Sequence, residues 1–268
     1  MIKQETGTIK TKFGTIVYSK LGVGKRIFLL HAAGHDRKDF LSIQVSFAKY
    51  GEVWTFDWPG HGESTWEYPE PISSVFFPQI LTEILEKTRT EEVLLLGNSI
   101  GGYAAIQVAL DQPSKVTGLI LVDSAGISQL DLFSKFFIKL KSEAWFTYLF
   151  WNLFPKFYLK KRNGDTKRIL EEIAKQRSNS NSIQTNALIW KSFLDPRLNL
   201  SARLSSLKIP VLLVWGKYDP VIPVSLGYQF QYSIHNSELQ ILPTGHLPFA
   251  EEPKLFLKTV ETFFAKIH

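Results

Sequence analysis

The fold is decided by the stretch VLLLGNSIGGYAAIQVAL, residues 93–110. Its first four residues form a continuous apolar, β-rich run, which is typical of a strand covered on both faces. The small residues of 100–110 predict a helix, and Pro113 soon afterwards cannot continue it. The stretch therefore predicts a buried strand that turns directly into a helix.

The turn between this strand and this helix holds a serine among glycines. Gly97 and Gly101 lack side chains, so they leave room for a tight, strained turn around Ser99. The turn lifts the Ser99 hydroxyl above the sheet and leaves the Ile100 N–H free at a helix N-terminus, where it can stabilise an oxyanion. This pattern makes Ser99 a candidate nucleophile.

The same alternation of strand and helix continues on both sides of this stretch. Strand patterns cover 15–19, 26–31, 53–57, 93–97, 116–123, 211–215 and 238–242, and helical patterns cover 74–87, 100–110, 224–232 and 254–267. Strands that alternate with helices predict an α/β fold with a mostly parallel sheet flanked by helices.

Residues 124–207 interrupt the regular pattern and predict an inserted helical lid, with 1–123 and 208–268 forming the core domain. Within the insert, 135–168 holds nine basic and two acidic residues, although the formal net charge of the whole chain is only +6. We expect the insert to have a role of its own, because all of the excess positive charge lies in it.

One helix of the insert, 132–144, is predicted to be amphipathic. Phe133, Phe136, Phe137, Leu140 and Ala144 form its apolar face, and Lys135, Lys139 and Lys141 lie mostly off that face. The main expectation is that the apolar face packs over the site. Contact with a membrane surface and recognition of an anionic substrate by the lysines are the alternatives.

Composition excludes several classes of protein. The 268 residues are long enough to bury a core, and the absence of cysteine excludes disulfides, thiol nucleophiles and cysteine metal sites. No apolar run approaches the 18 or so residues of a membrane span, and the N-terminus has no apolar signal segment, so we expect a cytoplasmic protein. No metal-ligand spacing, phosphate-binding lysine motif or nucleic-acid motif is found, so no cofactor, metal or nucleic acid is expected.

A serine hydroxyl needs a base that a third group holds in place, and two later loops offer these partners. Asp219 follows the strand at 211–215, and His246 follows the strand at 238–242. The carboxyl ends of parallel strands share one edge of a sheet, so Ser99, Asp219 and His246 can converge there. Their order along the chain is the order expected for such a turn.

Other acidic and histidine side chains compete for these roles. Asp123 also ends a strand and is the alternative acid, although it fits a turn or cap position equally well. His31 and His61 are expected to be structural, with His31 bonded to loop backbone.

Five stretches give the chain a resemblance to the α/β-hydrolase fold superfamily over nearly its full length: HAAGHD (31–36), FDWPGHGES (56–64), GNSIGG (97–102), GKYDPVIP (216–223) and GHLPFAEEP (245–253). The resemblance implies that Ser99 is the nucleophile, His246 the general base and acid, and Asp219 the carboxylate that orients it. It implies an oxyanion hole made by the N–H groups of Ile100 and Ala33. Ala32 departs from the glycine that is usual in the family.

The expected activity is that of a serine esterase or lipase-like hydrolase acting on a small hydrophobic ester through an acyl-enzyme on Ser99. The GNSxGG form of the turn is similar to that of enzymes that hydrolyse a carbon–carbon bond of ring-fission products, which is the first alternative. A thioesterase, an acyltransferase, a membrane-associated lipid enzyme and a slow, hydrolase-like ligand-binding protein also stay open.

Overall fold

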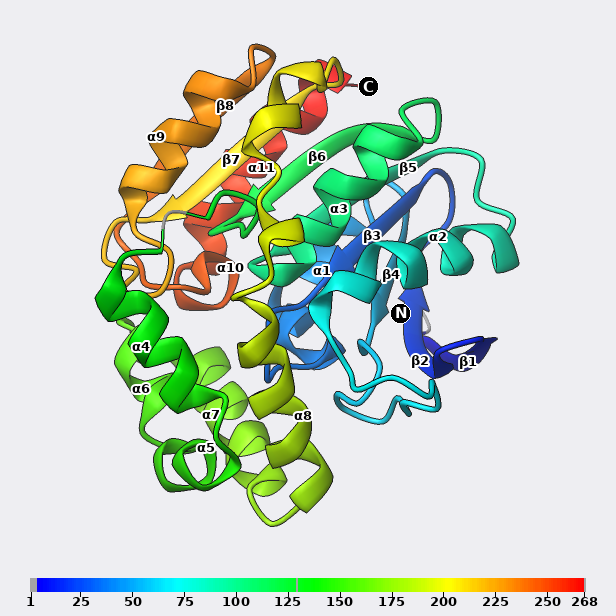
Figure 1. Ribbon diagram of the computed structural model, residues 1–268. Coiled ribbons are helices and arrows are strands. Elements are labelled where there is room, and N and C mark those ends of the chain that lie inside the picture. The colour runs from blue at the N-terminus through cyan, green and yellow to red at the C-terminus, as the bar shows by residue number, and fades with distance from the viewer. Residues whose placement is uncertain (1–3, 129, 268) are drawn as a thin grey trace.

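The computed structural model describes residues 4–128 and 130–267, and in this part of the chain eight strands form one sheet (Figure 1). The strand order is β1-β2-β4-β3-β5-β6-β7-β8. Strands β3 to β8 pair in parallel, whereas β1 pairs antiparallel with β2 and β2 antiparallel with β4. The strands are β1 Glu5–Thr11, β2 Gly14–Leu21, β3 Arg26–Leu30, β4 Glu52–Phe56, β5 Val93–Asn98, β6 Val116–Val122, β7 Val211–Gly216 and β8 Ser237–Leu242.

Helices cover both faces of the sheet, because successive residues of its central strands point to opposite faces and are apolar on each. In β3, Phe28 and Leu30 join one buried cluster, while Ile27 and Leu29 join the other. Helices α2 (Phe77–Lys87), α3 (Ile100–Asp111) and α9 (Val224–Ser233) pack on the first cluster, and α1 (Leu41–Phe47), α10 (Pro248–Glu251) and α11 (Pro253–Ile267) pack on the second. The predicted α/β class with a mostly parallel, helix-flanked sheet is confirmed.

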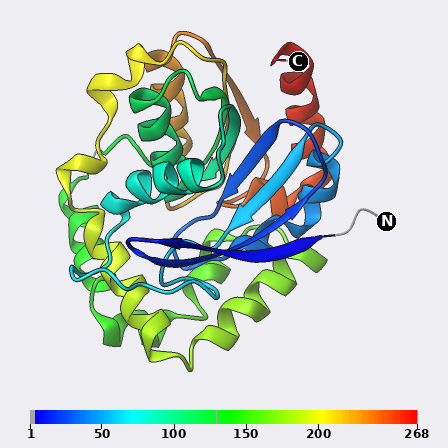
Figure 2. The ribbon, with the colours of Figure 1, turned by 90° about the vertical axis from the view of Figure 1, so that its right-hand side faces the viewer.

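The seven strands expected from the sequence are all present, with bounds that differ by one or two residues. Strand β1 and the short helices α1 and α10 were not expected. Strand β1 is an edge strand in which only Ile9 and Thr11 are buried, so its sequence ETGTIKT lacks an apolar run. Figure 2 shows β1 and β2 in the foreground, as a ribbon at the edge of the fold. Helices α1 and α10, of seven and four residues, are too short to produce a clear helical repeat.

Five helices between β6 and β7 form what we call the α4–α8 segment. They are α4 Leu132–Lys141, α5 Ala144–Phe150, α6 Phe154–Tyr158, α7 Gly164–Gln176 and α8 Ser180–Ser192. In Figure 1 they lie together, green to yellow-green, below the sheet and its flanking helices. None of the helices in the described residues is long and apolar enough to cross a membrane.

The predicted apolar face of α4 is wrong only in part, because Phe137 is half-buried and packs on Phe154 and Trp190 beside the pocket that contains Ser99. Phe133 and Phe136 are 74% and 60% exposed, whereas Ile138 and Lys141 are buried. The helix ends at Lys141, so Ala144 belongs to the next helix and does not extend the predicted stripe. The buried stripe is rotated because α4 packs against α5 and α8, and not against the sheet.

Candidate active site

Ser99 occupies a strained turn between β5 and α3. Its backbone has φ +54° and ψ −117°, a region that residues with side chains rarely adopt. The turn is also crowded: a Cβ on Gly97 would lie 2.5 Å from the Gly101 backbone, and one on Gly101 would lie 2.3 Å from the carbonyl oxygen of Leu30. The two glycines are therefore required by close backbone approach on either side of Ser99.

Asp219 and His246 form a buried hydrogen-bonded pair. Nδ1 of His246 lies 2.6 Å from Oδ2 of Asp219, and Oδ1 of Asp219 accepts a bond from the Val221 N–H. The backbone of His246 is tied to the strand that carries the serine, because Nδ2 of Asn98 donates to the His246 carbonyl. Since Nδ1 is engaged, Nε2 is the ring nitrogen left for a reacting group.

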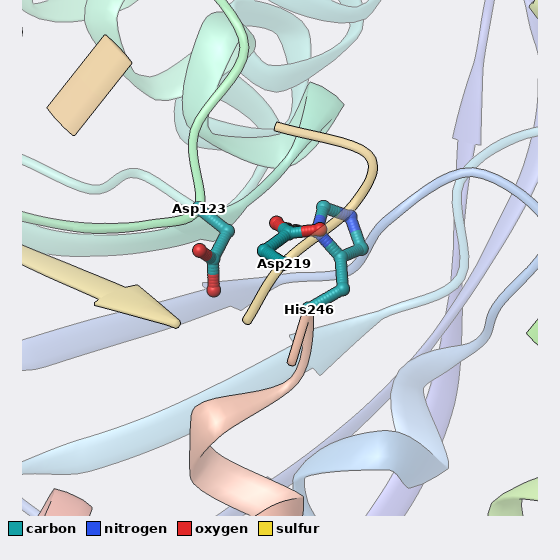
Figure 3. A group of neighbouring side chains, drawn as sticks. All are labelled: Asp123, Asp219 and His246. Atoms are coloured by element: carbon teal, nitrogen blue, oxygen red, sulfur yellow. Dashed lines mark hydrogen bonds and ion pairs between the residues drawn. The ribbon is translucent and has the colours of Figure 1, made fainter. Parts of the chain in front are cut away.

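Asp123, the alternative acid, lies beside this pair without bonding to the ring. Figure 3 shows Asp219 between Asp123 and His246. Oδ1 of Asp123 accepts a bond from the Gly216 N–H at the end of β7. Burial, together with the charge of Asp219, raises the pKa of the Asp123 carboxyl well above its usual range. Asp123 is thus a buried neighbour of Asp219 whose carboxyl holds its proton more strongly than an exposed aspartate does.

These three side chains also place oxygen and nitrogen atoms within 4.8 Å of one another, a grouping that sequence spacing does not reveal. The chemistry of these three side chains favours hydrogen bonding among them over the binding of a metal ion. The His246 nitrogen and the Asp219 oxygen already lie at hydrogen-bond distance, and a carboxyl with a strongly raised pKa is a poor ligand for a metal ion.

Ser99 and His246 line the same pocket, which lies between the loop after β3 and the α4–α8 segment. Ala33 and His35 come from that loop, and Lys141 comes from α4. The space open to the centres of water molecules is about 50 Å³, enough for a few waters. A larger ligand therefore requires some of the lining side chains to move.

The backbone N–H groups of Ala33 and Ile100, both beside the serine, have no hydrogen-bond acceptor among the described residues. Ala32 does not have a positive φ, unlike Gly34 at +75°, so alanine introduces no backbone strain at that position. His31 is structural as expected: its Nε2 accepts from the Trp58 N–H and its Nδ1 bonds the Ala32 carbonyl. His61 likewise bonds backbone, at the Pro59 carbonyl.

The loop that carries His246 is fixed by a buried glutamate that the sequence analysis did not single out. Oε2 of Glu251 accepts the N–H groups of Gly245, Lys160 and Lys161, and Oε1 accepts that of Leu247. Two of these donors belong to the His246 loop and two to the α4–α8 segment, so one carboxylate joins both. The only signal in the sequence was its place in GHLPFAEEP.

A second buried network borders the pocket. Nε2 of His35 lies 2.6 Å from the hydroxyl of Tyr158, and Nδ1 lies 2.5 Å from Asp39 Oδ2. Burial lowers the pKa of His35, but the Asp39 carboxylate outweighs it and the net shift is upward. The Tyr158 ring also lies 5.6 Å from that of His246. Nothing in the sequence joins residues 35 and 158, so only the fold reveals this contact.

The comparisons with known proteins agree with this architecture. The sequence profile of the α/β-hydrolase fold family matches residues 25–253. Among curated proteins, the chain is 24% identical to a pimeloyl-[acyl-carrier protein] methyl ester esterase of Wigglesworthia glossinidia brevipalpis, over 90% of this chain and 94% of that one. It is 27% identical to a 2-hydroxy-6-oxononadienedioate/2-hydroxy-6-oxononatrienedioate hydrolase of Paraburkholderia phymatum, over 93% of this chain and 90% of that one. Among solved structures, an esterase of Exiguobacterium antarcticum superposes with a TM-score of 0.84 at 20% identity, covering 97% of this chain and 100% of that one.

Proposed function

Because the chain belongs to the α/β-hydrolase fold family, we propose that it is a serine hydrolase that cleaves an ester-type bond of a small substrate through an acyl-enzyme on Ser99. The observation that carries the proposal is that the strained serine and the Asp219-bonded imidazole of His246 line one pocket. The pimeloyl-[acyl-carrier protein] methyl ester esterase that is similar to this chain supports the same reaction type.

In the first step, Oγ of Ser99 attacks the ester carbonyl carbon while Nε2 of His246 takes the hydroxyl proton. Asp219 holds the ring so that Nδ1 keeps its proton, and stabilises the imidazolium that forms. The free N–H groups of Ala33 and Ile100 bond the developing oxyanion, and such a donor contributes about 2.7–4 kcal/mol in comparable enzymes.

The tetrahedral intermediate then collapses, and His246 gives its proton to the leaving alcohol. A water molecule repeats the sequence: His246 takes its proton, the hydroxide attacks the acyl carbon, and Ser99 leaves with the proton returned. We assign the core to 1–123 and 208–268 and treat 124–207 as a lid, whose side chains exclude bulk water during these steps.

A second candidate is hydrolysis of a carbon–carbon bond. The similarity to the Paraburkholderia hydrolase and the GNSIGG turn favour it. A short p-nitrophenyl ester and a vinylogous diketone acid, assayed side by side, separate the two activities. Faster turnover of the diketone acid would replace the esterase proposal with this one.

The first experiment is labelling of the purified protein with a fluorophosphonate probe, followed by mass mapping. We expect stoichiometric labelling at Ser99, which Ser99→Ala and His246→Ala abolish. Ser124→Ala is the matched control, because this buried serine bonds the Ala125 carbonyl close to the same turn and does not line the pocket. Labelling that persists in Ser99→Ala contradicts the proposal.

Labelling alone does not exclude a slow, hydrolase-like ligand-binding protein. Turnover of a panel of short esters and acyl thioesters by the same preparation supplies that distinction. A ligand that raises the Tm strongly and is never turned over would favour the binding protein.

A further inference from the structure

Lys141 is a buried cation at the end of α4. Its side chain is only 3% exposed, although its helical position predicts a solvated lysine. The ammonium lies 4.7 Å from the centre of the Phe154 ring and 5.4 Å from that of Trp190, so two aromatic faces hold it. Both rings line the pocket that contains Ser99.

This ammonium has no anionic partner within the protein. Among the described residues, no carboxylate lies within 4.0 Å of the Lys141 Nζ, and no hydrogen-bond acceptor bonds to it. Lysine is almost never fully buried without a partner, because removing its charge from water is costly. The two aromatic rings offset only part of the free-energy cost of removing the ammonium from water, whereas an anion would offset more of it.

Lys141 is also placed where it can reach a ligand. It lines the pocket together with Ser99 and His246, and none of the described aspartates and glutamates lines that pocket. Lys141 and Phe154 also line a second cavity of about 410 Å³, whose walls are mostly aromatic. A ligand that enters beside Ser99 therefore meets the Lys141 ammonium between the Phe154 and Trp190 rings.

We propose that Lys141 binds an anionic group of the substrate, and that the substrate is a short ester that also carries a carboxylate. This inference rests on the proposed function, since it assigns the substrate class of the same site. The carboxylate takes the place of the missing partner, and the surrounding rings exclude the water that would compete for the ammonium.

Protonation of Lys141 makes the proposal testable by pH. Burial lowers the pKa of the Lys141 ammonium to about 8. The ammonium is thus charged below pH 8 and loses its charge above it. Other titratable groups border the two cavities or lie on the segments packed against α4: His35, Glu143, Tyr148, Lys156, Tyr158, Lys191 and His246.

The experiment compares two substrates that differ in one charge, 4-nitrophenyl hydrogen glutarate and its methyl-capped analogue, with succinate and adipate homologues to vary the reach. We expect the wild type to prefer the acid. Lys141→Met should lower kcat/KM for the acid about 10- to 100-fold, mainly through KM, and leave the capped ester within about threefold. Lys141→Arg should keep the preference, and Lys139→Met, an exposed lysine of the same helix, should change neither substrate.

Both substrates depend on the titration of His246 in the same way. The kcat/KM for the acid divided by that for the capped ester therefore does not contain this titration. We expect this ratio to fall as the pH rises through about 8 in the wild type, and to stay high in Lys141→Arg. Equal loss on both substrates in Lys141→Met, or a wild type that disfavours the acid, would overturn the proposal.

A binding measurement separates this proposal from the proposed function. Calorimetry with Ser99→Ala should detect monomethyl glutarate, and the additional change Lys141→Met should weaken its binding at least tenfold. If esters are cleaved without any preference for the charged substrate, this result contradicts the role of Lys141 but not the serine hydrolase. Failure of Ser99 to label, with monomethyl glutarate still bound through Lys141, contradicts the serine hydrolase alone.

Discussion

Asp123 and Asp219 follow neighbouring parallel strands, and only the carboxyl group of Asp219 bonds to the His246 ring (Figure 3). Asp123 instead accepts the Gly216 N–H and carries a raised pKa beside its neighbour. Sequence order alone left both residues as candidates for the acid. The side-chain contacts favour Asp219 and give Asp123 a structural place.

Replacing each aspartate by the isosteric asparagine should therefore have unequal effects. We expect Asp219→Asn to lower kcat by roughly 10³–10⁴, because the His246 ring is then held in the wrong tautomer. For Asp123→Asn we expect kcat to stay within about tenfold of the wild type, since Asp123 does not bond the His246 ring and an amide oxygen can still accept the Gly216 N–H. Steady-state kinetics on one ester measures both, and equal losses would return Asp123 to the role of the acid.

Glu251→Gln should destabilise the protein and lower its activity. An amide in place of the carboxylate sets an NH₂ group against at least one of the four backbone N–H donors, at a cost of about 2–4 kcal/mol. A fall in Tm of roughly 5–15 °C is expected. The neighbouring Glu252→Gln is the control, because Glu252 makes only a partly exposed ion pair with Lys161, and its Tm should be nearly unchanged. Equal Tm values for the two variants would contradict the role of Glu251.

Two glycine-to-alanine changes should have different effects on the free energy of unfolding. Gly101→Ala places a Cβ 2.3 Å from the Leu30 carbonyl oxygen in a packed part of the sheet, and we expect a loss of at least about 2 kcal/mol or insoluble protein. Gly164 starts α7, and a Cβ added there would have nothing within 4 Å, so Gly164→Ala should be neutral or stabilise by up to about 1 kcal/mol. Chemical denaturation measures both, and a tolerated Gly101→Ala would show that the turn is less crowded than described.

The stability of the protein should depend on pH through Asp36. Burial, followed by the charges of Asp39 and Asp57, raises the pKa of Asp36 from 3.8 to about 7. The folded protein then keeps a proton that the unfolded chain releases near pH 4. The stabilisation from this proton is complete below pH 4 and is lost as the pH rises towards 7.

Asp36→Asn removes this dependence while the amide oxygen still caps the Lys38 N–H. The Tm of the variant minus that of the wild type should therefore increase from pH 5 to pH 8. The corresponding change in the free energy of unfolding is at most a few kcal/mol. A difference in Tm that is constant over this range would contradict the raised pKa.

Sequence alone determined most of the sheet and the serine turn, because both depend on local patterns. Continuous apolar runs identify the central strands wherever both faces are covered, and glycines at 97 and 101 identify a turn that tolerates no side chains. Strand β1 was missed since an edge strand buries few residues. The cytoplasmic location and the roles of Ala33 and Ile100 remain predictions.

Only the tertiary structure decided what surrounds the serine. The choice between Asp219 and Asp123 depends on which carboxyl reaches the His246 ring, and the support from Glu251 joins segments about 90 residues apart. The buried side of α4 depends on which helices pack against it, so a helical repeat placed Phe133 inside and Lys141 outside, the reverse of the structure. The helical repeat of apolar residues predicts that a helix is amphipathic. It does not predict whether a charged side chain is buried, because that depends on neighbours that are distant in sequence.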